Sequence, residues 1–124
     1  MSKILIVDDD PDFVNGTRIV LEHEGYQVNN ANGGEAGYQK ALELDPDLII
    51  LDVMMDSVLD GVSTTRKLHN NPATSEIPIF MVTSIANTDY AELFPTDEYI
   101  HIEAFLSKPI APENLIKKIR RIIN

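Results

Sequence analysis

The hydrophobic residues of this chain fall into two kinds of run that alternate along the sequence. Short, almost wholly apolar runs predict buried strands, and longer runs with apolar residues three or four positions apart predict amphipathic helices. The predicted strands are Lys3–Val7, Tyr26–Asn30, Leu48–Leu51, Ile77–Val82 and Ala104–Leu106. The predicted helices run from Phe13 to Gly25, from Asn32-Gly33-Gly34 to about Leu44, from Gly61 to Asn70 and from Pro112 to Ile123.

Apolar strands that alternate with helices are typical of a parallel sheet whose two faces are both covered. The pattern therefore predicts an α/β fold, with a doubly wound five-stranded parallel sheet and helices on both faces. In such folds, ligands bind beyond the carboxyl ends of the strands, so functional residues are expected there.

Polar residues do follow the predicted strands at these ends. Asp8 and Asp9 follow the first strand, Asp52 the third, Thr83 and Ser84 the fourth, and Lys108 the fifth. Because parallel strands end at the same edge of a sheet, three carboxylates, hydroxyl groups and an ammonium group are expected to converge.

Carboxylates that lie close together repel one another, and a divalent cation relieves this repulsion. Oxygen ligands of this kind suit Mg²⁺, or the similar Mn²⁺, which retains waters and coordinates phosphate oxygens. Asp52 would then act as a nucleophile that forms an aspartyl phosphate. Lys108 and Thr83 would neutralise or hydrogen-bond the phosphoryl oxygens, since phosphoryl transfer depends on positioning and charge.

Charge and composition narrow the function further. A formal net charge of −10 argues against direct nucleic-acid binding and fits a cation-binding protein or one that docks on a basic partner. The chain has no cysteine, no apolar run long enough to span a membrane and no secretory signal, so we expect a cytoplasmic protein. Its length suits one domain over residues 1–124, without a separate output domain.

Four segments of the chain resemble the signature segments of response-regulator receiver domains, in the same order and across essentially the whole length. They are Ile4-Leu5-Ile6-Val7-Asp8-Asp9-Asp10, Pro46-Asp47-Leu48-Ile49-Ile50-Leu51-Asp52, Val82-Thr83-Ser84 and Lys108-Pro109. The resemblance implies a flavodoxin-like sheet with strand order 2-1-3-4-5. It also implies a two-component signalling switch rather than an enzyme with a separate substrate. A histidine kinase or histidine phosphotransfer protein would phosphorylate the switch, which would then bind a downstream protein target.

The resemblance also implies a role for each matching residue. Asp52 matches the phosphoacceptor, Asp8 and Asp9 the acidic metal pair, and the backbone carbonyl of Met54 a further metal ligand. Among the phosphate-binding and switch residues of the fourth and fifth strands, the matches are Thr83 as the switch hydroxyl with Ser84 beside it, Phe105 as the switch aromatic and Lys108 as the phosphate-sensing lysine.

Two segments depart from the family pattern. The segment from Val53 to Gly61 lacks the usual proline and carries one extra residue, which predicts a longer loop beside the site. The stretch between Thr83 and Lys108 is longer than usual and contains Pro95 where a helix is expected. Because proline in a helix interior costs about 3 kcal/mol, that helix should end before Pro95.

Two other functions remain open at this level. A phosphatase resembling haloacid dehalogenases would use the Asp-x-Asp within Asp8-Asp9-Asp10, but it also needs an acidic pair after the lysine and does not need Asp52. An unphosphorylated pseudo-receiver would act only as an interaction module. Pseudo-receivers usually lack one of the acidic or lysine positions, whereas this chain retains them all.

Overall fold

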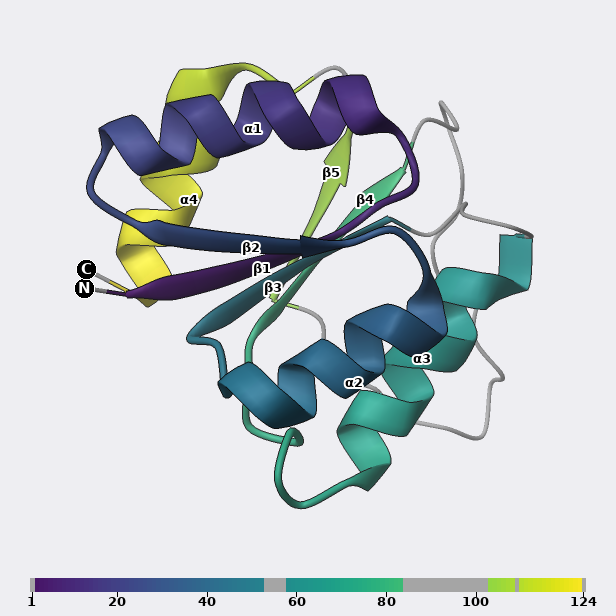
Figure 1. Ribbon diagram of the computed structural model, residues 1–124. Helices are drawn as coiled ribbons and strands as arrows, with labels where there is room; N and C mark the ends of the chain where they lie inside the picture. The colour runs from purple at the N-terminus through teal and green to yellow at the C-terminus, as the bar shows by residue number, and fades with distance from the viewer. Residues whose placement is uncertain (1, 53–57, 84–102, 109, 124) are drawn as a thin grey trace.

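A computed structural model describes residues 2–52, 58–83, 103–108 and 110–123, with the side chains at 58–62, 83, 105 and 107 left out. Strands and helices alternate along the described chain (Figure 1). In chain order the elements are β1 (Lys3–Val7), α1 (Pro11–His23), β2 (Gln27–Ala31), α2 (Gly34–Leu44), β3 (Leu48–Asp52), α3 (Val58–Asn70), β4 (Ile79–Thr83), β5 (Ala104–Ser107) and α4 (Pro112–Ile122).

The strands form one parallel sheet in the order β2-β1-β3-β4-β5, which gives a flavodoxin-like α/β fold. The order agrees with the one implied by the family resemblance. β1 lies between β2 and β3, so the chain reverses direction across the sheet after its second strand. Between β1 and β3 this reversal creates the switch point at which doubly wound sheets bind ligands.

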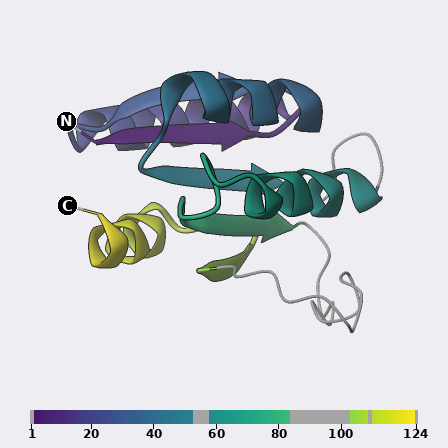
Figure 2. The ribbon, with the colours of Figure 1, turned by 90° about the horizontal axis from the view of Figure 1, so that it is seen from below.

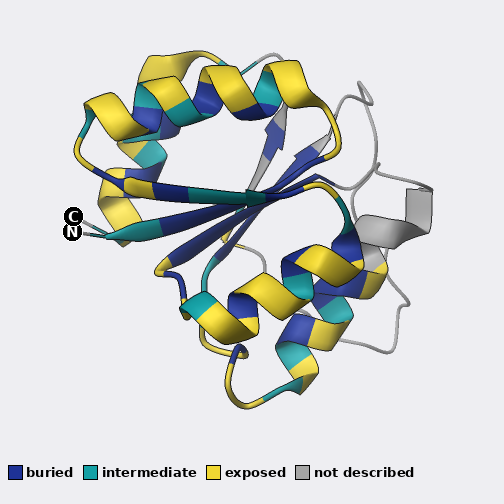
Figure 3. Cartoon of the chain, in the orientation of Figure 1, coloured by how far each residue is buried: buried dark blue, intermediate teal, exposed yellow. Residues whose placement is uncertain are grey.

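Two hydrophobic cores lie on opposite faces of the sheet, because successive strand residues point to alternate faces. On one face, Ile4, Ile6, Leu48 and Ile50 pack with residues of α1 and α4; on the other, Leu5, Val7, Ile49 and Leu51 pack with residues of α2 and α3. Figure 1 shows the two helix pairs on either side of the sheet, and α2 and α3 come forward when the molecule is seen from below (Figure 2). Burial follows this arrangement, with buried strands between helices whose outer faces are exposed (Figure 3).

The ends of α1 show why its bounds differ from the predicted Phe13–Gly25. Asp10 caps the helix by accepting the backbone N–H groups of Asp12 and Phe13, so α1 begins at Pro11, a favoured first position. The helix ends at His23, and Gly25 takes the left-handed conformation (φ 93°) that redirects the chain into β2.

Two other predicted boundaries shift by two or three residues. β4 begins at Ile79 rather than Ile77, because the N–H of Ile77 donates to the carbonyl of Thr74 in a turn. α3 begins at Val58, earlier than the predicted Gly61, within the segment that carries the extra residue.

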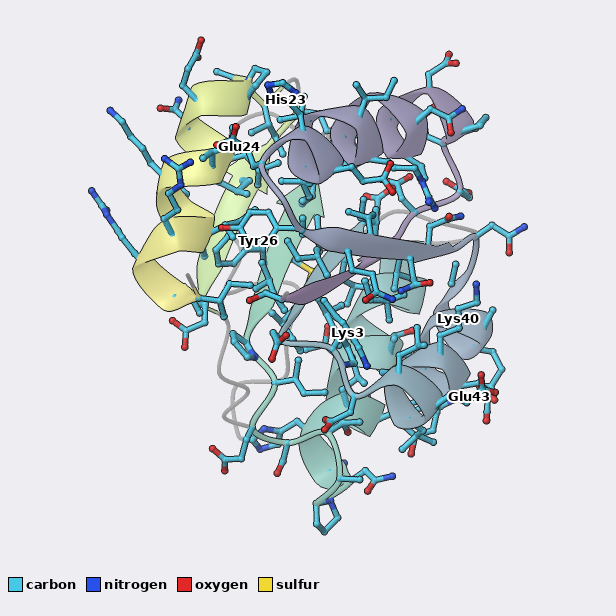
Figure 4. All side chains as sticks on the ribbon, turned by 60° about the vertical axis from the view of Figure 1, so that its left-hand side comes forward. Lys3, His23, Glu24, Tyr26, Lys40 and Glu43 are labelled. Carbon is cyan, nitrogen blue, oxygen red and sulfur yellow. The ribbon has the colours of Figure 1, made fainter. Side chains whose placement is uncertain are left out.

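Ionic side chains join the layers at the periphery. Arg120 of α4 donates to Glu24 at the end of α1, and Lys40 of α2 donates to the carbonyl of Asn30 on the outer strand β2. Glu24 and Lys40 are labelled in Figure 4. Arg18 of α1 donates to the carbonyl of Val28 on the same strand. The contacts of Lys40 and Arg18 cover carbonyl groups of β2 at the free edge of the sheet, where an unpaired edge invites association.

Candidate functional site

Strand register places the predicted site residues at one level. Val7 pairs with Leu51, so Asp8 and Asp52, the next residues, lie side by side at the carboxyl ends of β1 and β3. On the far side, Thr83 at the end of β4 pairs with Ser107 of β5, and Lys108 follows directly. The parallel register therefore carries four strand ends to one edge.

The carboxylates of Asp8, Asp9 and Asp52 form a cluster at this edge. Each offers an oxygen, and these oxygens all lie within 4.8 Å of one another. Asp8 and Asp52 are only 2% and 5% exposed, whereas Asp9 is exposed to solvent. Two buried carboxylates beside an accessible one create a concentrated negative charge that solvent reaches from one side.

The ammonium group of Lys108 lies against this cluster. Its Nζ is 2.9 Å from Asp8 Oδ2 and 3.5 Å from Asp52 Oδ2. Burial alone would lower the pKa of Lys108, but contact with Asp8 and the charges of Asp52, Asp8 and Asp10 outweigh it and raise the pKa above its ordinary value. Lys108 is therefore held in its charged form beside the carboxylates.

The two carboxylate oxygens of Asp8 have different partners. Oδ1 accepts the backbone N–H of Asp10 at 2.8 Å. Oδ2 is fully buried, and its contact among the described residues is the ion pair with the Lys108 ammonium group at 2.9 Å. A buried acceptor of this kind, with two further carboxylate oxygens nearby, fits the all-oxygen shell preferred by Mg²⁺ or Mn²⁺.

Two residues near the site take parts that sequence reasoning did not assign. Asp10 links Asp8 to the start of α1, and its charge acts on Lys108. Phe13 places its ring under the Lys108 ammonium, with 4.3 Å between Nζ and the ring centroid. The Asp10-Pro11 pair is a recognisable helix start, but helical periodicity marks Phe13 only as a core position.

Several predicted site residues fall outside the described part of the structure. Met54, Ser84 and Pro95 belong to undescribed segments, as does most of the longer loop after Asp52. For Thr83 and Phe105 the backbone is placed in β4 and β5, but their side chains are not described. Their predicted roles stay predictions.

No helix in the described ranges combines the length and apolar character that a membrane crossing requires.

Comparison with known protein families gives one match across most of the chain. Residues 4–120 match the family model described as the response regulator receiver domain. The matched segment contains the three carboxylates of the cluster, Asp8, Asp9 and Asp52, together with Lys108.

Individual relatives agree with this match. The chain is 34% identical to the DNA-binding dual master transcriptional regulator RpaA of Synechocystis sp., covering 99% of this chain but 49% of that protein. It is 32% identical to Protein PilH of Pseudomonas aeruginosa, covering 99% of this chain and 98% of that protein. The chain thus spans about half the length of some curated relatives and nearly the whole of another.

A solved structure with the same fold carries a metal. The receiver domain of a sensor histidine kinase from Pseudomonas aeruginosa, described with a magnesium ion coordinated in its active site cleft, superposes with a TM-score of 0.86. The two sequences are 26% identical, and the match covers 98% of this chain and 97% of that one.

Proposed function

The chain belongs to the family of response regulator receiver domains, and we propose that it is a signalling switch phosphorylated on Asp52. The observation that carries the proposal is the position of Asp52. Asp52 is the last residue of the central strand β3. Its carboxylate lies in a cluster with those of Asp8 and Asp9, 3.5 Å from the ammonium group of Lys108.

The acidic cluster supports a divalent metal requirement. Asp8, Asp9 and Asp52 would hold Mg²⁺ or Mn²⁺, with the Met54 carbonyl as a further ligand by family resemblance. A metal bound there would neutralise the carboxylates and the oxygens of an incoming phosphoryl group. The magnesium described in the cleft of the structural relative is consistent with this assignment.

In the proposed reaction, a carboxylate oxygen of Asp52 attacks the phosphorus of a phosphohistidine on a kinase or phosphotransfer protein. The new P–O bond forms as the P–N bond breaks, and the histidine imidazole leaves with the bonding electrons. Lys108, fixed in its charged form, stabilises the negative charge on the transferred group. The domain thereby catalyses only its own modification and acts on no separate substrate.

The readout would pass through residues at the ends of β4 and β5. By family resemblance, Thr83 and Ser84 would bind the phosphoryl group, and Phe105 would change position in response. The altered surface would then change binding to a downstream protein. We assign the domain to the cytoplasm, with no direct contact to nucleic acid or membrane, in keeping with its net charge of −10.

The decisive experiment is intact mass measurement after incubation with Mg²⁺ and acetyl phosphate, a small phosphodonor. The wild-type chain should gain one phosphoryl group that is labile to base. Asp52→Asn should gain none, and chelation of the metal with EDTA should abolish the gain in the wild type. Glu43→Gln, which removes an exposed carboxylate of α2 that is not part of the cluster, serves as the matched control and should behave as wild type (Figure 4).

The alternatives give different outcomes in the same experiment. A phosphoryl group that persists in Asp52→Asn and maps to Asp8 would favour the phosphatase. Magnesium binding without any gain in mass, from acetyl phosphate or from phosphorylated kinase, would favour the pseudo-receiver.

A further inference from the structure

Among the described residues, the ammonium group of Lys108 has three close neighbours of two different kinds. Two are the carboxylates of Asp8 and Asp52, and the third is the aromatic face of Phe13. The side chain of Lys108 is only 16% exposed. A cation over an aromatic face is attracted by the ring quadrupole, and the attraction strengthens as water is excluded.

Phe13 is itself held in place relative to the acidic cluster. Asp8 accepts the N–H of Asp10, and Asp10 in turn accepts the N–H of Phe13 at 3.4 Å as part of the helix cap. The ring also packs, together with Ile110, against the core between the sheet and α1 and α4. The start of α1 therefore fixes the aromatic face at a set position beside Asp8, one of the proposed metal ligands.

Lysine needs such a support more than most charged side chains. Its four-carbon stem is flexible, and its compact, strongly hydrated charge forms no rigid fork with a carboxylate. The contacts with Asp8 and Asp52 also depend on what else those carboxylates bind. Phe13 ligates no metal, so its attraction for the ammonium group persists when a cation engages the carboxylates.

We propose that Phe13 is a positioning residue for phosphoryl transfer, whose aromatic face holds the Lys108 ammonium group at the level of Asp52. The inference rests on the proposed function, because it assigns Phe13 a part in that reaction. It predicts that aromatic character at position 13, and not merely hydrophobic bulk, sets the rate of phosphorylation.

The test compares Phe13→Leu, which keeps a branched apolar side chain, with Phe13→Tyr, which keeps the aromatic face. Phe13 lines a hollow of about 280 Å³ between α1 and the start of α4, which leaves open space beside its side chain. Val20→Ala is the matched control, since Val20 lines the same hollow further along α1. It reports the effect of removing apolar bulk from this hollow without changing the residues that contact Lys108.

The first readout is the rate of phosphorylation by acetyl phosphate in Mg²⁺, with stability measured in parallel. Phe13→Leu should slow the rate about fivefold, the rate equivalent of a partly buried cation–π contact. Phe13→Tyr should restore it to within about twofold of wild type, and Val20→Ala should not slow it, whatever its melting temperature. In a Lys108→Met background, Phe13→Leu should cause no further loss.

The second readout needs no phosphorylation. In metal-free protein, NMR resonances of the Lys108 methylene beside the ammonium group should be shifted by the aromatic ring. The shift should vanish in Phe13→Leu and remain in Phe13→Tyr.

Equal phosphorylation rates in wild type and Phe13→Leu, or the same loss of rate in Phe13→Tyr and Phe13→Leu, would overturn the inference and leave the proposed function intact. Absence of the ring-dependent shift would overturn it as well. A wild-type chain that takes no phosphoryl group from any donor would instead overturn the proposed function, and the role of Phe13 with it.

Discussion

Replacing Asp52 by asparagine should stabilise the metal-free domain while abolishing its phosphorylation. Asp52 and Asp8 lie within 4.8 Å and repel by about 3.5 kcal/mol at the effective dielectric near a protein surface. Exposed Asp9 adds about 1 kcal/mol through water. The attraction between Asp52 and Lys108 over 3.5 Å is about 5 kcal/mol on the same scale. The attraction of Asp52 to Lys108 therefore nearly cancels its repulsion from Asp8 and Asp9.

Desolvation then decides the sign of the change. Asp52 is 5% exposed, and an ion removed from water loses several kcal/mol of solvation, more than a neutral amide of the same shape. We therefore expect Asp52→Asn to raise the free energy of unfolding in EDTA by about 2 kcal/mol. Magnesium should narrow or reverse this difference, because a ligand at a hundredfold excess over its Kd stabilises the wild type by about 2.7 kcal/mol.

Urea unfolding followed by far-UV circular dichroism suits this measurement, since the chain has no tryptophan for fluorescence. Glu43→Gln, which makes the same change in net charge at an exposed position, should shift the unfolding free energy by less than about 0.5 kcal/mol. Asp9→Asn should change metal-free stability little but reduce the magnesium gain. An Asp52→Asn variant that is less stable than wild type in EDTA would refute this balance of terms, and an undiminished magnesium gain in Asp9→Asn would place the metal elsewhere.

Three further outcomes are expected away from the site. Gly37→Ala should destabilise the domain by about 1–3 kcal/mol, because an added Cβ would lie 2.7 Å from both methyl carbons of buried Val7. Gly16→Ala, whose Cβ would meet nothing within 4 Å, should stabilise α1 by up to about 1 kcal/mol, and urea unfolding that ranks the two variants in the opposite order would contradict the packing. The hydrogen bond from Lys67 holds the pKa of Glu35 below 4.5, so this contact stabilises the fold above that pH and is lost as the pH falls through the lowered value. A carboxyl NMR titration should show that pKa rise in Lys67→Met, and an unchanged titration would show that the ion pair does not form in solution.

The sequence alone determined the number, type and approximate bounds of the described elements. Wholly apolar runs such as Leu48–Leu51 leave no solvent-facing side, so they predict strands covered on both faces. Local chemistry marks the end of α1 at Gly25, whereas apolar periodicity alone predicts a start at Phe13, two residues after Pro11, where the helix capped by Asp10 begins. The strand-end positions of Asp8, Asp52 and Lys108 also followed from the sequence, because the polar residues directly follow the apolar runs.

Only the tertiary structure decided which strands are neighbours and how closely the site residues approach. A strand buried on both faces shows no alternation, so its sequence cannot tell that Leu5 packs towards α2 and Ile6 towards α1. Local pattern does not predict strand order, since parallel pairing depends on contacts between distant segments; family resemblance implies the order, and the structure shows it. The 4.3 Å approach of Lys108 to Phe13 has the same origin. It joins residues from opposite ends of the chain, and it exists because the register of the sheet brings the end of β5 to the start of α1.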